Sequence, residues 1–194
     1  MNNSLIFAVL AAALTLGPLA QGAEPKVKVL SVAEDATQKS VLIGRNRADN
    51  MIVTFALEAA EAMRMPMGNP PKWSDHPVMK GEIYHLEVKP VDPKSGTRIS
   101  YAEVTFSAIN RDNKKRVAGT MHPVWGETGL HYAANSPLAG DGSYDTTITV
   151  GVPTFSRVSE NKDMWMKPVT TQFHFKLAGG KVVEVSEPVE ETRK

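Results

Sequence analysis

Apolar and polar residues alternate along most of the chain, in short segments separated by turn-forming residues. Side chains on a β-strand point to opposite faces in turn, so this alternation buries one face and exposes the other. Gly179-Gly180 is a dipeptide typical of a β-hairpin turn. Short strands with frequent turns predict an all-β fold, an antiparallel β-sandwich. The predicted strands are residues 26–32, 82–91, 99–109, 116–121, 143–152, 169–177 and 181–185.

Residues 51–58 fit two structures. Met51, Val53, Phe55 and Leu57 would form an apolar face on a strand. The ALEAAEAM continuation, however, has a high propensity for helix. The β-rich remainder of the chain favours a strand, with a helix as the alternative.

Two other segments are predicted to be loops. Residues 34–50 are polar apart from an apolar interruption at 41–43, and residues 62–80 contain four prolines, which disfavour regular structure. His76 lies in the second loop and is predicted to be exposed. The same loop carries three methionines, whose thioethers can fill packing gaps or bind copper: Met63, Met65 and Met67.

The stretch GTMHPVWGETGLHYAAN, residues 119–135, predicts a hairpin that carries two histidines on one face. With residues 127–128 at the tip, Val124 lies opposite His131, and His122 shares their face. Two imidazoles would then converge within reach of one metal ion. Glu-Thr is a weak hairpin turn, but a four-residue loop would keep this register. A slip of one residue would separate the histidines.

A second histidine-containing pattern is the HLE sequence at residues 85–87. His85 and Glu87 are two apart on a predicted strand, so they point to the same face about 6.6 Å apart. A histidine and a carboxylate so presented make half of a metal site. The alternative is an exposed pair on the solvent face of an edge strand. His174 alternates with Phe173 and Phe175, which predicts that it faces solvent.

The first 23 residues have the layout of a secretory signal peptide. A polar start is followed by an apolar run from Leu5 to Leu16 and then by small residues up to Ala23. The run is too short for a membrane span, which needs about 20 apolar residues. Cleavage after Gly22 or Ala23 would leave residues 24–194 as one domain in the periplasm, not inserted in the membrane. The absence of cysteine excludes disulfides and a lipid-anchored start.

Composition and motifs narrow the function. The formal net charge is +1 and there is no basic block, so we expect no nucleic-acid partner. A nucleophile elbow, an HExxH motif, a phosphate-binding glycine loop and a cysteine nucleophile are all missing from the sequence. We therefore expect a protein that is not an enzyme.

Four short motifs resemble the periplasmic high-affinity iron transport proteins, a copper-binding family associated with iron/lead permeases. The resemblance runs from about Met51 to Leu177. It implies an immunoglobulin-like β-sandwich, usually a homodimer, that assists an inner-membrane iron permease. The motifs are HLE at residues 85–87, GTMHP at 119–123, HYAAN at 131–135 and MWMKP at 164–168.

The resemblance implies a copper site made of three histidines and a methionine, with a nearby glutamate that helps to bind a second metal ion. The motifs place two of the histidines at His85 and His131 and the glutamate at Glu87. The family methionine falls on Val124 and the third histidine on Val158, neither of which can bind a metal.

The candidate ligands are therefore His85, Glu87, His131 and, as a replacement on the face of residue 124, His122. Other residues that could replace a missing ligand are Met121, Met63, Met65, His76 and Met164.

The leading hypothesis is a periplasmic protein that binds copper, iron or another divalent transition metal and assists an iron permease. The alternative is a structural or protein-binding sandwich domain whose metal site has degenerated, because two ligand positions differ. A periplasmic metalloenzyme comes last, since no pattern of nucleophile or general base accompanies the ligands.

Overall fold

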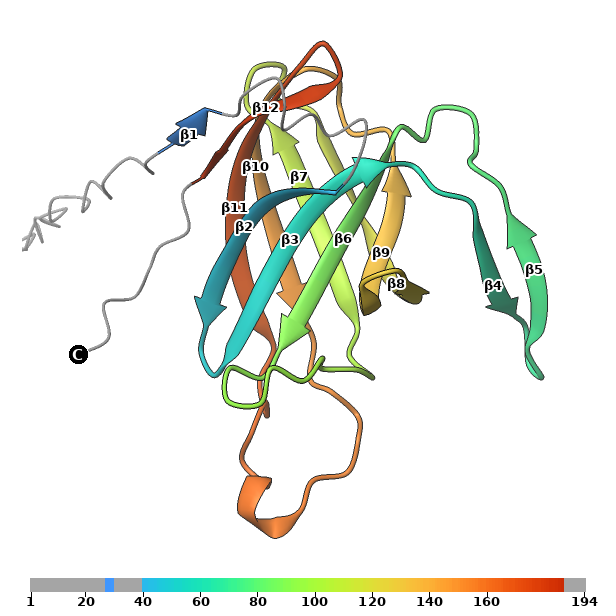
Figure 1. Ribbon diagram of the computed structural model, residues 1–194, viewed down its shortest axis with the longest axis vertical. Helices are drawn as coiled ribbons and strands as arrows, with labels where there is room; N and C mark the ends of the chain where they lie inside the picture. The colour runs from blue at the N-terminus through green and yellow to red at the C-terminus, as the bar shows by residue number, and fades with distance from the viewer. Residues whose placement is uncertain (1–26, 30–39, 187–194) are drawn as a thin grey trace, which may run out of the picture.

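Two layers of antiparallel strands face each other in the computed structural model, which describes residues 27–29 and 40–186 (Figure 1). One layer consists of β1 (Val27–Val29), β12 (Lys181–Ser186), β11 (Val169–Ala178), β10 (Gly142–Val150), β7 (Val104–Asn110) and the first half of β8 (Arg116–Gly126). The other consists of the second half of β8, β9 (Gly129–Ser136), β6 (Tyr84–Val91), β3 (Met51–Ala59) and β2 (Val41–Ala48).

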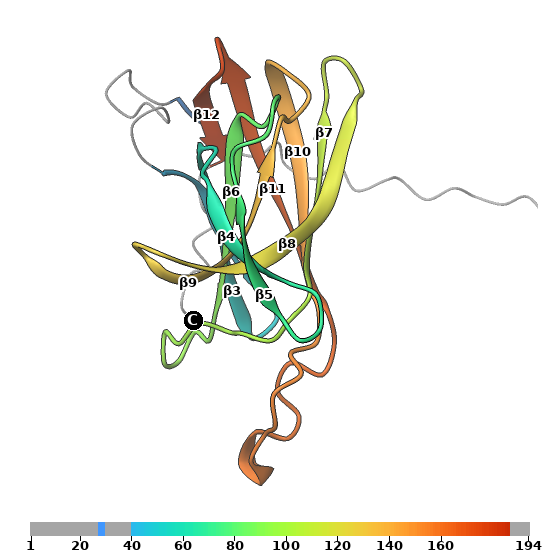
Figure 2. The same ribbon diagram turned by 90° about the vertical axis from the view of Figure 1, so that its right-hand side faces the viewer.

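Strand β8 belongs to both layers. Residues 116–121 pair with β7, and residues 122–126 pair with β9. Figure 2 shows β8 leaving the side of β7 and crossing to β9. On the opposite side of the sandwich, Asn46 of β2 donates to the carbonyl of Gln172 in β11 at 2.7 Å. The result is a nearly closed sandwich, which confirms the predicted all-β, immunoglobulin-like antiparallel β-sandwich.

The core lies between the layers and is filled by the inward residues of each strand. Phe55 of β3 packs against Phe173 and Phe175 of β11, with ring centroids 5.4 and 6.2 Å apart. Each such fully buried apolar side chain contributes about 1.5–3 kcal/mol. Leu86 and Val88 of β6 point into the same core. His85, which precedes Leu86, and Glu87, which lies between Leu86 and Val88, therefore point to the outer face of the sheet.

The predicted strands at 82–91, 143–152, 169–177 and 181–185 are confirmed as β6, β10, β11 and β12, and the strand at 26–32 is confirmed for 27–29. Residues 51–58 form strand β3, so the helical alternative is wrong. The strand predicted from residue 99 starts at Val104, because Tyr101 adopts a positive φ of 56° that interrupts extended backbone.

The loop predicted at 34–50 is wrong for residues 41–48, which form strand β2. A bulge between Leu42 and Gly44 shifts the alternation by one residue, which hides the strand from a search for a period of two. Gly44 also lets β2 approach β11, since a Cβ there would lie 2.9 Å from the ring of Phe173. Residues 34–39 lie outside the described part of the chain.

The loop predicted at 62–80 is also partly wrong. Met63–Met67 (β4) and Lys72–His76 (β5) pair as a hairpin that extends away from the sandwich (Figure 1). Each strand of a two-stranded ribbon is an edge strand, so its outer amides have no partner strand. Proline, which has no N–H, is tolerated on such strands, and Pro66 lies in β4. Pro70 and Pro71 lie in the connecting turn.

The predicted signal peptide, residues 1–23, and the charged tail, residues 187–194, lie outside the described residues. Within the described ranges, no helix has the length and hydrophobicity needed to cross a membrane.

Candidate metal centre

The hairpin of β8 and β9 has the register that its sequence predicts. Val124 pairs with His131, and His122 pairs with Ala133, with residues 127–128 forming the two-residue turn. Gly126 gives the imidazole of His131 room, because a Cβ at this position would lie 2.8 Å from Cε1 of the ring. The hairpin therefore packs closely over one of its own histidines.

Strand β6 brings a second imidazole beside the first. His85 pairs with Asn135, and Glu87 pairs with Ala133, which lies between Asn135 and His131 on the same face of β9. The small side chain of Ala133 leaves room for the rings of His85 and His131, whose centroids are 6.1 Å apart at an angle of 85°. Convergence of these two histidines is thus a property of the fold.

The predicted shared face of His85 and Glu87 is confirmed, but the alternative of an exposed pair is wrong. The exposed fractions are 0% for His85, 3% for Glu87 and 5% for His131. These three polar side chains are buried on the outer face of a sheet. His131 lies beside both His85 and Glu87, and Glu87 contacts Thr128 of the hairpin turn.

Hydrogen bonds determine which nitrogen of each ring carries a proton. The amide nitrogen of Asn135 donates to the carbonyl oxygen of Glu61, which turns its Oδ1 toward Nδ1 of His85 at 2.9 Å. His131 places Nδ1 2.9 Å from the carbonyl oxygen of Gly129. Both Nδ1 atoms are therefore donors, and in a neutral ring Nε2 then carries a lone pair.

Neither Nε2 atom has a hydrogen-bond partner among the described residues, although both are buried. An Nδ1–H held by an oxygen and a free Nε2 is the arrangement found in metal-binding histidines. Burial lowers the pKa of His131, and nearby His85 adds to this effect against the opposing influence of Gly129 and Glu87. A lowered pKa favours the neutral ring, the form that binds metals.

Glu87 is already fully engaged by protein groups. It accepts from Nζ of Lys89 at 2.6 Å and from the hydroxyl of Thr128 at 3.0 Å, and it lies 3.3 Å from Nδ1 of His131. Burial would raise the pKa of Glu87, but the hydrogen bond and charge of Lys89, with smaller effects of His131 and Thr128, lower it. The carboxylate is thus ionised and orients His131.

The remaining candidates lie in different surroundings. His122 is on the predicted face but is exposed. Met121 is 2% exposed and belongs to the core, on the opposite face of β8. Val158 is exposed in the loop between β10 and β11. This loop projects from one end of the sandwich, and β6 starts at the other end (Figure 1). Met164 lies in this loop too, and Nε of Arg157 binds its carbonyl.

The hairpin of β4 and β5 carries three further candidates, Met63, Met65 and His76. Met63 and His76 are paired across it, and Nε2 of His76 lies 3.7 Å from a carboxylate oxygen of Glu82. His76 is half-buried rather than exposed as predicted, because it packs beside Glu82. His174 lies opposite the core face of β11, as predicted, with Nδ1 2.6 Å from Asp145.

Two acidic residues beside His85 were missed by the sequence reasoning. Glu58 pairs directly with His85 across β3 and β6, and its Oε1 lies 4.0 Å from Nε2. Glu61 follows β3 and completes a group of three whose ligand atoms all lie within 4.8 Å of one another. Burial raises the pKa of Glu58, and the charges of Glu61 and Glu87 raise it further, against His85 and Lys89. The Glu-x-x-Glu spacing in ALEAAEAM was the available signal.

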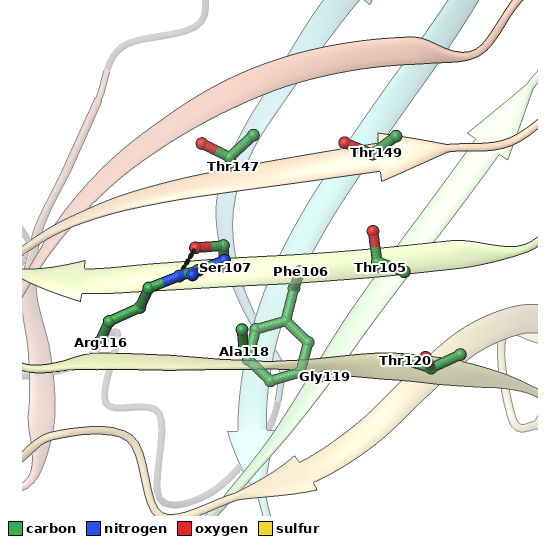
Figure 3. A pocket seen from close by; sticks show the side chains of 9 residues that line it. All are labelled: Thr105, Phe106, Ser107, Arg116, Ala118, Gly119, Thr120, Thr147 and Thr149. Carbon is green, nitrogen blue, oxygen red and sulfur yellow. Dashed lines mark hydrogen bonds between the residues drawn. The ribbon is translucent and has the colours of Figure 1, made fainter.

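An open groove of about 620 Å³ on another part of the surface has different chemistry (Figure 3). It runs over β7, β8 and β10, and Arg116 is its one ionisable lining residue, with Nε donating to Ser107 at 2.7 Å. Its other polar residues are hydroxyl-bearing: Thr105, Ser107, Thr120, Thr147 and Thr149. The histidine pair is not part of this groove.

Fold and site together define a β-sandwich with two buried imidazoles on the outer face of one sheet. A family model described as Fe2+ transport protein matches residues 38–179 of the chain. The chain belongs to this family. This confirms the iron-transport family inferred from its motifs.

The chain is also similar to a curated protein sequence and to two solved structures. A UPF0423 protein of Brucella abortus (strain 2308) is 26% identical, over 77% of this chain and 88% of the relative. The fold is that of FetP from uropathogenic E. coli strain F11, with a TM-score of 0.59 and 20% identity over 73% of this chain and 97% of FetP. It is also that of copper-reconstituted P19 from Campylobacter jejuni, with a TM-score of 0.58 and 19% identity over 72% and 97%.

Proposed function

We propose that this protein is a periplasmic transition-metal-binding protein that serves iron uptake. The observation that carries this proposal is the buried pair of His85 and His131, whose Nε2 atoms lack a hydrogen-bond partner in the described residues. Membership of a family described as Fe2+ transport protein supports it, as does the copper in structurally similar P19. We assign a binding rather than a catalytic role because the family is one of transport.

The donor set suits a borderline metal ion. A separation of 6.1 Å between ring centroids is compatible with one ion held by both imidazoles at metal–nitrogen distances of about 2.0 Å. Imidazoles bind Cu(II), Zn(II) and Fe(II), whereas Cu(I) prefers sulfur, which Val124 does not offer. We propose His122 as a further ligand on this face, with Glu87 orienting His131. Copper and iron are the ions proposed first.

The proposal includes a location, an assembly and a partner. Residues 1–23 would be removed on export, leaving residues 24–194 as a periplasmic domain that assists an inner-membrane iron permease. We propose a homodimer, and light scattering at micromolar concentration should give twice the mass of one chain. A single-chain mass with and without metal would contradict the dimer.

Calorimetric titration of the untagged protein with Cu(II), and anaerobically with Fe(II), tests the ligands. His85→Ala and His131→Ala should each weaken Cu(II) binding at least tenfold, because each removes one imidazole donor from the ion. His174→Ala is the matched control, since its ring lies on the other sheet beside Asp145. Equal effects of all three substitutions would place the metal elsewhere.

A protein-binding role without metal is the second candidate. The exposed apolar side chains Met67 and Trp73, on the projecting hairpin of β4 and β5, favour it. A protein that contains no metal after purification and takes up no added copper, zinc or iron would support this candidate over the first.

A further inference from the structure

The end of β3 gathers two carboxylates beside His85. Glu58 lies directly opposite His85 across the β3–β6 pair, and Glu61 follows two residues after the strand ends. One oxygen from each glutamate and a ring nitrogen of His85 lie within 4.8 Å of one another. Two anionic groups so close together repel each other unless a cation lies between them.

The imidazole of His85 directs its unpartnered atom at these carboxylates. Its Nε2 is fully buried and lies 4.0 Å from Oε1 of Glu58, which is too long for a hydrogen bond. Because Nδ1 donates to Asn135, Nε2 of the neutral ring presents a lone pair to a carboxylate. A bound cation would satisfy the nitrogen and the carboxylate together.

Asn135 positions both halves of this cluster. Its Oδ1 accepts from Nδ1 of His85 and, at 3.3 Å, from the backbone N–H of Glu61. Its Nδ2 donates at 2.8 Å to the carbonyl oxygen of Glu61. One side chain thus sets the orientation of the imidazole and holds the backbone that carries the second carboxylate.

We propose that Glu58, Glu61 and His85 bind a divalent cation that accepts carboxylate as well as imidazole ligands, Fe(II) or Mn(II), at the end of β3. Carboxylates suit Mn(II), and carboxylates combined with imidazole are the donors of non-haem Fe(II) sites. Exposure decreases from Glu61, which is exposed, through Glu58, 23% exposed, to His85 at 0%. The cluster is therefore accessible from solvent. This inference rests on the proposed metal-binding function, since both use His85, and it adds two carboxylate ligands.

Mn(II) is the probe, because its free ion gives an electron paramagnetic resonance signal that is lost on binding. The untagged protein is titrated at pH 7 and compared with Glu58→Gln, Glu61→Gln and the double variant, which remove charge but keep shape. Glu160→Gln, which removes an exposed carboxylate in the β10–β11 loop, is the matched control. Circular dichroism checks that each variant is folded. Glu61→Gln should disturb the fold least, because Glu61 is exposed and lies beyond the end of β3.

We expect the wild type to bind one Mn(II), the double variant to bind it at least tenfold more weakly, and Glu160→Gln to match the wild type. A wild type that takes up no Mn(II), or a double variant and Glu61→Gln that bind it normally, would overturn the inference.

A parallel titration with Cu(II) separates this inference from the proposed function. Loss of Cu(II) binding in His85→Ala and His131→Ala, together with normal Mn(II) binding in the glutamate variants, would refute only the carboxylate site. Normal Cu(II) binding in both histidine variants would refute the proposed function instead.

Discussion

Lys89→Met tests how the buried charges beside His131 are balanced. Lys89 is the cation in contact with Glu87, at 2.6 Å, and the two side chains are 14% and 3% exposed. Methionine keeps the length of the side chain but removes its charge. Glu87 would then be a buried carboxylate held only by Thr128, His131 and, at 3.5 Å, Ser40.

The expected loss of stability follows from this geometry. Breaking a buried ion pair by removing one partner costs about 3–5 kcal/mol. The hydroxyl of Thr128 and the ring of His131 still bind the carboxylate, so we expect about 2–3 kcal/mol. For a chain of this size that corresponds to a decrease in Tm of roughly 4–12 °C.

The loss should depend on pH with a definite sign. Lys89 lowers the pKa of Glu87 below its ordinary value of 4.5, so the pair stabilises the fold above about pH 4.5 and the contribution is lost as pH falls through the lowered pKa. Without Lys89, the effect of burial, which raises the pKa of Glu87, is opposed only by the smaller effects of His131 and Thr128. A protonated Glu87 needs no countercharge, so the difference between variant and wild type should be largest near pH 7 and smaller in acid.

Urea denaturation at pH 7 and pH 4.5 measures this difference. Lys176→Met is the matched control, because its partner Glu184 lies at 3.3 Å with the two side chains 42% and 33% exposed. Such surface pairs contribute about 0–1 kcal/mol. A loss below 1 kcal/mol for Lys89→Met, or one that is the same at both pH values, would refute the reasoning.

Three further predictions follow from the sequence and the site. Export should give a mature N-terminus at Ala23 or Glu24, and an intact Met1 in periplasmic protein, found by mass spectrometry, would contradict it. Cu(II) affinity should fall below about pH 6, because protons then compete with the metal for Nε2. A free imidazole titrates at about pH 6.5 and burial lowers the pKa of His131; calorimetry at pH 5 and pH 7 measures the difference in affinity. Val124→Met should raise Cu(I) affinity and His122→Ala should weaken Cu(II) binding, both measured by competition titration. Unchanged Cu(II) binding in His122→Ala would show that His122 is not a ligand.

Local patterns were enough to predict the hairpin that carries the histidines. Its register depends on the alternation of side chains and on a turn at residues 127–128, both visible in one contiguous stretch. Val124 therefore faces His131 as predicted. The same local reasoning placed His85 and Glu87 on one face, because two residues of one strand need no knowledge of other strands.

Burial of that face was not predictable from β6 alone. A histidine and a glutamate separated by Leu86 are typical of an exposed strand face, whereas here both are buried and the turn of the β8–β9 hairpin packs against Glu87. Thr128 of that turn donates to Glu87, and Gly126 leaves space for the ring of His131. Thr128 lies 41 positions from Glu87 in the sequence, and the hairpin that carries it depends on the bend by which β8 changes layers.

Glu58 and Glu61 required still more long-range information, and this explains why the carboxylates were missed. Each belongs to a segment whose local pattern fits a helix as well as a strand, and in a helix they would lie on one exposed face, three residues apart. Pairing of β3 with β6 places Glu58 opposite His85 instead, across 27 positions of sequence and an intervening hairpin. Asn135, from a third strand, then fixes Glu61. The cluster therefore depends on three strands adopting a single register, and a one-residue slip of β3 would turn Glu58 toward the core, where an unpaired carboxylate is strongly unfavourable. The sequence of β3 thus specifies its pairing register and the position of Glu58 beside His85 together.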